Sequence, residues 1–443
     1  MTRVFSSEKL VLFGFFTSVI LVGSGLLSLP AAWGGLHPLS YLNALFTSAS
    51  AVCVTGLITV DTAQYTRFGQ IVILLLIQTG GLGIISFTTV YLAVPKRKIS
   101  FRSIHIIKEY YLDTVEYQTN SIVRNIVVAT LSIELAGAIM LYFGFRTTVH
   151  HALIFTALFH SVSAFCNAGF STFSNGLGGY TSNPGVSLIV VLLIVLGGIG
   201  FVVIQDLWRR ASGSQKRLLL HTRVVLISTA VLIMVGLGMY LLLEWNNQFR
   251  RLGTGDRIVA ALFQSVTTRT AGFNTINEAG MTATSKLFTL ILMFIGGASG
   301  STAGGIKVTT TAIIVLAAIR GVRREGEMEM GNRKIGASTI ARAHIFAIKA
   351  LAVLFVCIFL LTLTELHGRQ TDVSFLQIVF ESFSAFGTVG LSLDTTPHLT
   401  ELGKIVIIFT MFAGRVGLIS FALPGVRKQQ SNIHFPEGEV LIG

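Results

Sequence analysis

The amino-acid sequence predicts an all-α membrane protein with eight transmembrane helices, arranged as four tandem repeats. Three observations lead to this fold class. Of the 443 residues, 52% are hydrophobic and only 12% are charged, and the mean hydropathy of +0.73 lies outside the range of a water-soluble globular protein. A short polar segment recurs four times along the chain, and a glycine cluster follows each copy.

The predicted spans are apolar runs of about 20 residues, the length that an α-helix needs to cross a hydrocarbon core of ~30 Å. The first run, "KLVLFGFFTSVILVGSGLLSL", is longer than the apolar core of about 7 to 15 residues in a cleaved secretory signal. Because it also opens the first repeat, we interpret it as a membrane helix. Eight such helices begin near residues 9, 68, 120, 185, 222, 284, 342 and 402.

The formal charge of +13 comes from basic residues in three hydrophilic loops, "PKRKISFRSIHIIK", "WRRASGSQKR" and "RGVRREGEMEMGNRK". Each loop follows an even-numbered helix, so all three lie on one side of the membrane together with both termini. An excess of Lys and Arg marks that side as cytoplasmic. The same residues suit a nucleic-acid or anionic-lipid surface, but membrane topology already explains the pattern, so we expect no nucleic acid as a partner.

The recurring segment reads "FTSASAVCVTGL", "FHSVSAFCNAGF", "FQSVTTRTAGF" and "FESFSAFGTVGL", and its glycines are Gly56, Gly169, Gly272 and Gly390. The first half of each copy has the length and small-residue content of a short helix that enters the membrane and stops midway. The second half then returns as extended chain around the glycine. Each repeat is therefore predicted as a helix, a pore loop and a second helix.

The spacing of these segments divides the chain into four repeats and a tail. A repeat often serves only packing between neighbouring units, but the polar composition of these loops favours a second role. The predicted units are repeat 1 at 1–95 with its pore loop at 40–60, repeat 2 at 96–210 with its pore loop at 150–172, repeat 3 at 211–330 with its pore loop at 256–275 and an intramembrane loop at 296–307, repeat 4 at 331–428 with its pore loop at 373–392, and a carboxyl-terminal tail at 429–443.

Irregular backbone at membrane depth is stable only where it is buried in protein or lines a water-filled cavity. Four such loops around a central pore can turn their carbonyl oxygens inward, and a ring of carbonyls replaces the hydration shell of a potassium-sized cation. Glycine suits this chain because the backbone takes dihedral angles that a Cβ penalises. The candidate filter residues are Val54, Thr55, Gly56, Asn167, Ala168, Gly169, Thr270, Ala271, Gly272, Thr388, Val389 and Gly390.

Glycine clusters lie in the helix after each pore loop. We interpret the first two, "GGLGIISF" and "GGIGFVVI", as sites of close helix packing. The third, "GGASGSTAGGIK", cannot form a firm helix and predicts an intramembrane loop below the filter. It is similar to a phosphate-binding loop, but Ile306 displaces Lys307 from the position that such a loop requires. The predicted loop residues are Gly296, Gly297, Ala298, Ser299, Gly300, Ser301, Thr302, Ala303, Gly304 and Gly305.

The fourth cluster, "GRVGLISF", aligns with the first residue for residue and places Arg415 where the first repeat has Gly81. A guanidinium group near the middle of a membrane helix costs ~2.5 to 3.5 kcal/mol on insertion scales, so we expect it to face protein or water and to bear on function. Glu134 and Glu381 are further candidates for buried carboxylates. For both, a structural hydrogen bond or salt bridge is the favoured interpretation over a transport role.

With these motifs the whole chain resembles the potassium-translocating membrane subunits of the Trk, Ktr and HKT superfamily, and most of all the Ktr-type subunits. All four filter glycines match, and glycine at the position of Gly56 goes with potassium preference, whereas some plant members carry serine there and favour sodium. The resemblance implies that Arg415 is the pore arginine of the family. It also implies that residues 296–305 form the gating loop.

The resemblance further implies a homodimer with one pore per subunit in the bacterial inner (plasma) membrane. A cytosolic nucleotide-binding ring is expected to switch the pore, with the nucleotide bound to that partner and not to this chain. K⁺ is the expected transported ion, and Na⁺ is expected to stimulate uptake. The end "SNIHFPEGEVLIG" resembles the tail that reaches toward the partner subunit, although composition alone equally fits a polar terminus.

Two other classes of function were weighed against this channel-like transporter. An integral membrane enzyme is disfavoured because the sequence contains no HExxH or GxSxG motif, so no enzyme activity is expected. An inverted-repeat symporter is disfavoured because every unit has an even number of helices, which makes the four repeats parallel. The three cysteines, Cys53, Cys166 and Cys357, exclude a disulfide scaffold and a cysteine-rich metal site.

Overall fold

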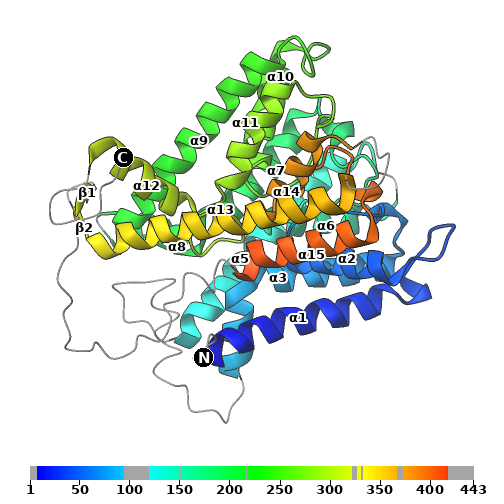
Figure 1. Cartoon of the computed structure of the whole chain (residues 1–443), viewed down its shortest axis with the longest axis horizontal. Coiled ribbons are helices and arrows are strands. Elements are labelled where there is room, and N and C mark those ends of the chain that lie inside the picture. Colours follow the sequence, from blue (N-terminus) through cyan, green and yellow to red (C-terminus); the bar gives the residue numbers. More distant parts are fainter. Residues whose placement is uncertain are drawn as a thin grey trace.

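The computed structural model describes residues 7–93, 119–149, 151–215, 217–321, 327–330, 333–366 and 373–417, and these are mostly helical (Figure 1). The all-α fold class is thereby confirmed. The predicted tail at 429–443 and the first basic loop, at 95–108, lie outside the described residues.

Four long helices open the four predicted repeats. They are α1 (Ser7–Leu27), α5 (Thr119–Phe145), α9 (Leu220–Glu244) and α13 (Ala337–Leu366). Within the described residues these are the four helices that are long and apolar enough to cross a membrane, or five spans if one bent pair is counted. Eight spans and the four-repeat arrangement therefore remain predictions.

Four shorter helices carry the recurring segment: α2 (Tyr41–Val52), α6 (Leu153–Phe165), α10 (Thr254–Thr267) and α14 (Phe375–Gly387). Each packs against the long helix before it. The starts of α2 and α14 are fixed by serine caps, and Ser374 and Gln377 form a full capping box at α14.

A serine two residues after the phenylalanine joins each of the first three short helices to its long helix. Ser48, Ser161 and Ser265 donate to the carbonyls of Ile20, Glu134 and Ile233, at 2.7, 2.6 and 2.8 Å. A glycine one turn farther along the long helix leaves room for this approach. Helix α13 contains no glycine, and there Ser382 bonds within its own helix, to Ile378 O.

The helices that follow the pore loops differ from one repeat to the next. They are α3 (Arg67–Ala93), α7 (Pro184–Ile199) with α8 (Phe201–Ala211), α11 (Ala283–Phe294) with α12 (Val308–Arg320), and α15 (Glu401–Phe412) with the π-helical turn η5 (Ala413–Gly417). Only α3 runs on as one α-helix through its glycine cluster.

The second glycine cluster is more than a packing site. Close packing is present, because a Cβ on Gly197 would overlap the carbonyl of Phe165 at the end of α6. However, α7 and α8 also meet at an angle of 100° at Gly200, whose φ is +87°. The expectation of an unbroken helix here is therefore wrong, because three glycines in four residues permit a bend that the third repeat then occupies.

Two glutamates fix the starts of the helices that follow the third and fourth pore loops. Glu244, at the end of α9, accepts from the backbone N and the hydroxyl of Thr282, at 2.9 and 3.0 Å. Glu365, near the end of α13, accepts in the same way from Thr400, with 2.6 Å to the hydroxyl. Both threonines are N-caps, so in the third and fourth repeats a buried carboxylate of the long helix holds the start of the helix that follows the pore loop.

The remaining elements are small and lie in the connections between helices. A two-stranded antiparallel hairpin, β1 (Met328–Met330) and β2 (Arg333–Ile335), follows α12. Short 3₁₀ turns, η1 (Pro30–Ala32), η2 (Thr62–Gln64), η3 (Gly178–Tyr180) and η4 (Thr396–His398), lie in the connections beside the pore loops.

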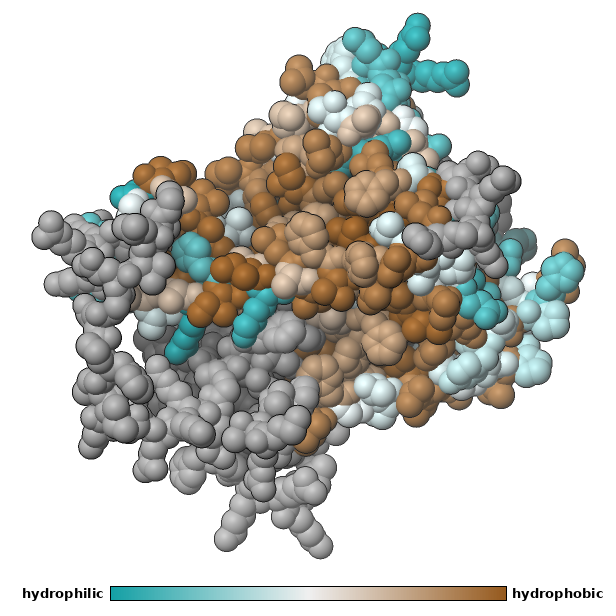
Figure 2. Space-filling view, in the orientation of Figure 1, coloured by the Kyte–Doolittle hydropathy of each residue, from teal (hydrophilic) through white to brown (hydrophobic). Residues whose placement is uncertain are grey.

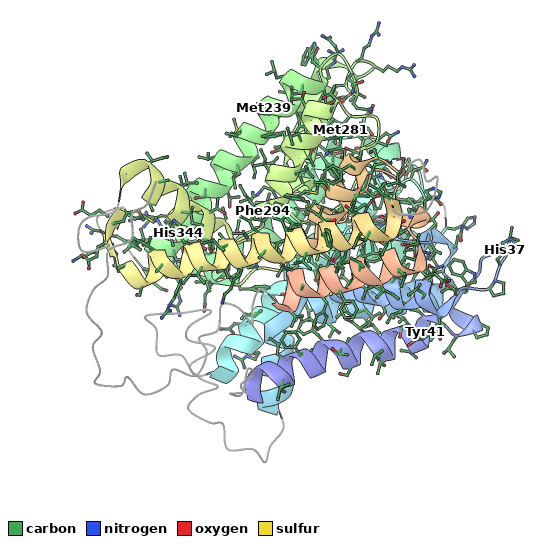
Figure 3. All side chains as sticks on the ribbon, viewed as in Figure 1. His37, Tyr41, Met239, Met281, Phe294 and His344 are labelled. Atoms are coloured by element: carbon green, nitrogen blue, oxygen red, sulfur yellow. The ribbon has the colours of Figure 1, made fainter. Side chains whose placement is uncertain are left out.

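The surface of the described helices is apolar over a broad band, with hydrophilic residues gathered toward the edges (Figure 2). Large apolar side chains such as Val22, Leu242 and Phe355 are more than half exposed in the isolated chain. Exposed apolar surface of this extent is typical of contact with lipid or with another subunit. His37 and Tyr41 lie at one periphery of the view, His344 lies toward the other, and Phe294 lies near the centre (Figure 3).

Candidate functional site: a ring of four glycines

The four pore-loop glycines lie against one another in a closed cycle. A Cβ on Gly56 would meet the segment at Gly169, one on Gly169 the segment at Gly272, one on Gly272 the segment at Gly390, and one on Gly390 the segment at Gly56. In each case the nearest atom is the carbonyl oxygen of the residue before the neighbouring glycine, at less than 3.0 Å. These four oxygens belong to Thr55, Ala168, Ala271 and Val389.

The helices follow the same cyclic order. Helix α3 packs against α6, α7 against α10, α11 against α14, and α15 against α2. The helix that leaves one pore loop thus supports the short helix of the next loop, and the last one supports the first. A hydrogen bond of 3.0 Å from Lys404 Nζ to Asn43 Oδ1 joins α15 to α2 at this closing contact.

The backbone of each pore loop takes a positive φ at two positions. The residue two positions before each glycine has a positive φ, at +56° for Val54, +58° for Asn167, +77° for Thr270 and +50° for Thr388, and the glycine itself is positive again. A left-handed conformation costs a residue with a Cβ roughly 1 to 2 kcal/mol. Strain repeated at four equivalent positions marks this segment as the candidate functional site.

One hydroxyl in each repeat ties the short helix to its loop, and the sequence interpretation missed it. Ser50 Oγ accepts from Gly56 N and Ser384 Oγ accepts from Gly390 N, both at 3.0 Å. Ser163 and Thr267 donate to the carbonyls of Phe170 and Phe273, at 2.7 and 2.6 Å. The available signal was a serine or threonine four residues after the phenylalanine in all four copies.

The glycine-rich loop of the third repeat lies between α11 and α12 and fills the bend between α7 and α8. Its Ala298 N donates to Gly198 O at 2.9 Å, and Gly300 O accepts from Phe201 N at 3.2 Å. Thr302 Oγ1 donates to Gly197 O, and at 3.3 Å also to Phe165 O at the end of α6. The loop is thereby held directly beneath the end of the second short helix.

The two ends of this loop meet. Gly296 N donates to Ile306 O at 2.8 Å, and a Cβ on Gly296 would overlap the carbonyl of Gly304. A Cβ on Gly304 in turn would collide with the side chain of Thr388 in the ring. Lys307 Nζ donates to Ala303 O at 2.6 Å, a contact that the sequence interpretation also missed.

Arg415 lies in the π-helical turn η5 and reaches two other repeats. Its Nη1 donates to Thr302 O in the glycine-rich loop, and its Nη2 donates to Gly80 O in α3 at 2.6 Å. Only 7% of the residue is exposed. Its counterpart Gly81 has no room for a side chain, because a Cβ there would lie 2.5 Å from Cys166 Sγ.

The two acidic candidates are both buried in hydrogen-bond networks. Glu134 in α5 accepts from Gln78 Nε2 of α3 at 3.2 Å. Glu381 in α14 accepts from the hydroxyls of Ser392 and Thr396. Within the described residues no group of three His, Cys, Asp or Glu side chains could hold a metal ion.

Comparison with known proteins shows the family of this chain. The family model of TrkH, described as cation transport protein, matches residues 19–434. The chain belongs to the TrkH family. The resemblance found in the sequence is thereby confirmed, and this TrkH-family protein is a membrane transporter and not an enzyme.

Two curated relatives cover nearly the whole chain. Ktr system potassium uptake protein B of Bacillus subtilis is 39% identical over 99% of this chain and 97% of its own length. Potassium/sodium uptake protein NtpJ of Enterococcus hirae is 36% identical over 99% and 97%. The crystal structure of the potassium transporter TrkH from Vibrio parahaemolyticus has a TM-score of 0.73, covering 94% of this chain and 84% of its own at 22% identity, which establishes a shared fold.

Proposed function

We propose that this TrkH-family protein is the potassium-translocating membrane subunit of a K⁺ uptake system. The observation that carries the proposal is the closed cycle of four glycines with a carbonyl oxygen at each contact. The relatives named for potassium uptake over nearly the full chain support K⁺ as the ion.

The ring would act as a selectivity filter. A K⁺ ion loses part of its hydration shell on entry, and carbonyl oxygens of the four repeats replace the lost water. The four short helices end at the ring, so the partial negative charge of each carboxyl-terminal end adds to the attraction of a cation. The ion then moves down its electrochemical gradient, which requires no catalytic group.

Residues 296–305 and Arg415 would form the gate. The loop lies against Thr388 of the ring through Gly304, and Arg415 holds it at Thr302 while also bonding to α3. The positive charge raises the barrier to a cation, and the loop adds a steric obstacle. Because Arg415 connects three repeats, a shift of the loop would also change contacts in the first and fourth repeats.

The wider assembly follows the expectation from the family. We propose a homodimer with one pore per subunit in the bacterial plasma membrane, both termini cytoplasmic, controlled by a cytosolic ring that binds the nucleotide. Na⁺ stimulation of uptake is part of the proposal, and the name of the potassium/sodium relative supports it. The exposed apolar surface of the described helices supports contact with lipid and with a second copy.

Restored growth at low potassium tests the function. Expression of this chain with a Ktr-type cytosolic subunit in bacteria that lack potassium uptake should restore growth, with a smaller effect of the chain alone. Uptake of K⁺ and Na⁺ is measured separately in the same cells. Normal membrane expression without any K⁺ uptake, with or without the cytosolic subunit, would contradict the proposal.

Thiol labelling tests the proposed topology. Ser214 and Gly178 are both exposed, and the native cysteines Cys53, Cys166 and Cys357 are buried, so background labelling should be low. In intact cells, an impermeant maleimide should label Gly178→Cys and should leave Ser214→Cys unlabelled until the membrane is opened. Labelling of both variants from outside would refute cytoplasmic termini.

A further inference from the structure

One register position of the four short helices is polar in every repeat but chemically different in each. It is the residue directly after the phenylalanine, and it is Thr47, His160, Gln264 and Glu381 in chain order. All four side chains are at most 1% exposed. A buried polar side chain costs free energy unless it is hydrogen-bonded. The hydrogen-bond partner of each residue therefore shows which segment of the chain that residue holds in place.

In the first two repeats the partner lies in the chain that leaves the ring. Thr47 Oγ1 accepts from the hydroxyl of Tyr65 at 3.1 Å. His160 Nε2 lies 2.9 Å from Ser171 Oγ, and Ser171 is the second residue after Gly169.

The same relation holds in the third and fourth repeats. Gln264 Nε2 donates to both oxygens of Glu278, at 2.8 and 3.0 Å. Glu381 accepts from Ser392 and, at 3.0 Å, from Thr396. Ser392 is the second residue after Gly390, so it occupies the same register position as Ser171 in the second repeat.

We propose that these four residues are positioning residues for the outer half of the filter, and that His160 and Glu381 contribute most to ion preference. The inference rests on the proposed function, because it assigns a role within the same filter. The hydroxyls four residues after the phenylalanine hold each loop at or beside its glycine. The proposed residues hold the chain beyond the glycine, and His160 and Glu381 hold it only two residues away.

The geometry around His160 fixes its chemistry. Its Nδ1 lies 2.8 Å from Thr156 O, which can only accept, so Nδ1 carries the proton. In the neutral ring Nε2 is then an acceptor for the hydroxyl of Ser171, and Ser171 Oγ accepts from Phe173 N at 3.0 Å. The imidazole also stacks on the ring of Phe173, with the centroids 4.7 Å apart. The bond to Ser171 and the stacking on Phe173 restrain the chain that leaves Gly169, whereas the bond to Thr156 O holds the imidazole on its own helix, α6.

Two substitutions at His160 distinguish the contribution of Nε2 from that of Nδ1. Glutamine can place an amide group near the position of Nε2, whereas asparagine reaches only as far as Nδ1. We expect His160→Gln to keep the bond to Ser171 and stay within about twofold of the wild type, and His160→Asn to lower the K⁺ over Na⁺ preference about tenfold. Glu381→Gln and Glu381→Leu form the equivalent pair in the fourth repeat.

The matched control is Ser161→Ala. Ser161 is the next residue of the same helix and is equally buried, but its hydroxyl bonds away from the ring, to Glu134 O in α5. A purely structural contribution should lower the amount of folded protein in both variants without changing ion preference. The readouts are uptake of K⁺ and Na⁺ per purified, reconstituted dimer, and the K⁺ concentration that half-maximally raises the Tm of detergent-purified protein.

The proposal is supported if His160→Asn and Glu381→Leu change both readouts while His160→Gln and Ser161→Ala do not. It is overturned if folded His160→Asn keeps the wild-type preference and K⁺ dependence of Tm, or if Ser161→Ala shifts them equally. A wild-type protein that carries K⁺ in the same assay separates failure of this inference from failure of the proposed function. A wild-type protein that carries no K⁺ would overturn both.

Discussion

Gly56→Ser is expected to remove most of the preference for K⁺ over Na⁺. The φ of Gly56 is +92°, a region that costs residues with a Cβ roughly 1 to 2 kcal/mol. A Cβ there would lie 2.5 Å from Ala168 O and 3.2 Å from the Cα of Gly169. One quarter of the ring would have to move, so a drop in selectivity of about tenfold or more is expected, because tenfold corresponds to about 1.4 kcal/mol.

Ion-resolved uptake or reversal potentials measure this change. The control is Gly25→Ser in α1, because Gly25 belongs to the same predicted repeat and has open space where a Cβ would lie. It should keep wild-type selectivity. Unchanged selectivity of a normally expressed Gly56→Ser variant would remove Gly56 from the filter.

Arg415→Ala is expected to raise ion flux through each pore. The guanidinium group presents a buried positive charge and holds the glycine-rich loop at Thr302. Two unit charges 4 Å apart interact by about 4 kcal/mol at an effective dielectric constant of 20, so removal of the charge should increase flux by at least about tenfold. Shortening the loop between Gly297 and Gly304 should also raise flux by lowering a steric barrier.

The two changes should be less than additive when combined, because they act on one closed state. Lys404→Ala provides the control, since it removes a cation from α15, the helix directly before η5, at the contact with Asn43. Flux is normalised to purified, reconstituted protein. If Arg415 only anchors the fold, its loss should reduce the amount of folded protein with no gain in flux per molecule, and that result would refute the gate.

Much of this architecture could be predicted from the sequence because the repeats share one local pattern. The phenylalanine and the hydroxyl four residues later stand at fixed spacing, the glycine follows the phenylalanine by ten residues in three copies and by nine in the third, and apolar runs of membrane length flank them. The predicted helix starts fall within five residues of those in the structure. Local pattern is sufficient where the same contact is made four times.

The bend at Gly200 could not be predicted in this way. The cluster "GGIG" has the composition of a packing site, and Gly197 and Gly200 do pack closely against the backbones of Phe165 and of Ser299. What bends the chain lies 100 residues away, in the carbonyls and amides of the third repeat that fill the gap. The glutamates at 244 and 365 were missed for a related reason, because each is satisfied by a threonine more than 30 residues later.

Arg415 shows the opposite case, where a local anomaly led to a long-range contact. An arginine at a glycine position was enough to expect a side chain that faces protein or water and bears on function. The bond to Gly80 O was not expected, because it joins η5 of the fourth repeat to α3 of the first, 335 residues apart in the sequence.

The closing contact of the ring also has a consequence for biosynthesis. The segment at Gly390 completes the cycle by meeting the segment at Gly56, which the ribosome has released hundreds of residues earlier. The first three loops are therefore inserted into the membrane before the fourth loop exists, and the cycle cannot close until α14 and α15 have been inserted. A chain that stops before residue 390 lacks the segment that closes the cycle, so its first and third loops each keep one side without a neighbour.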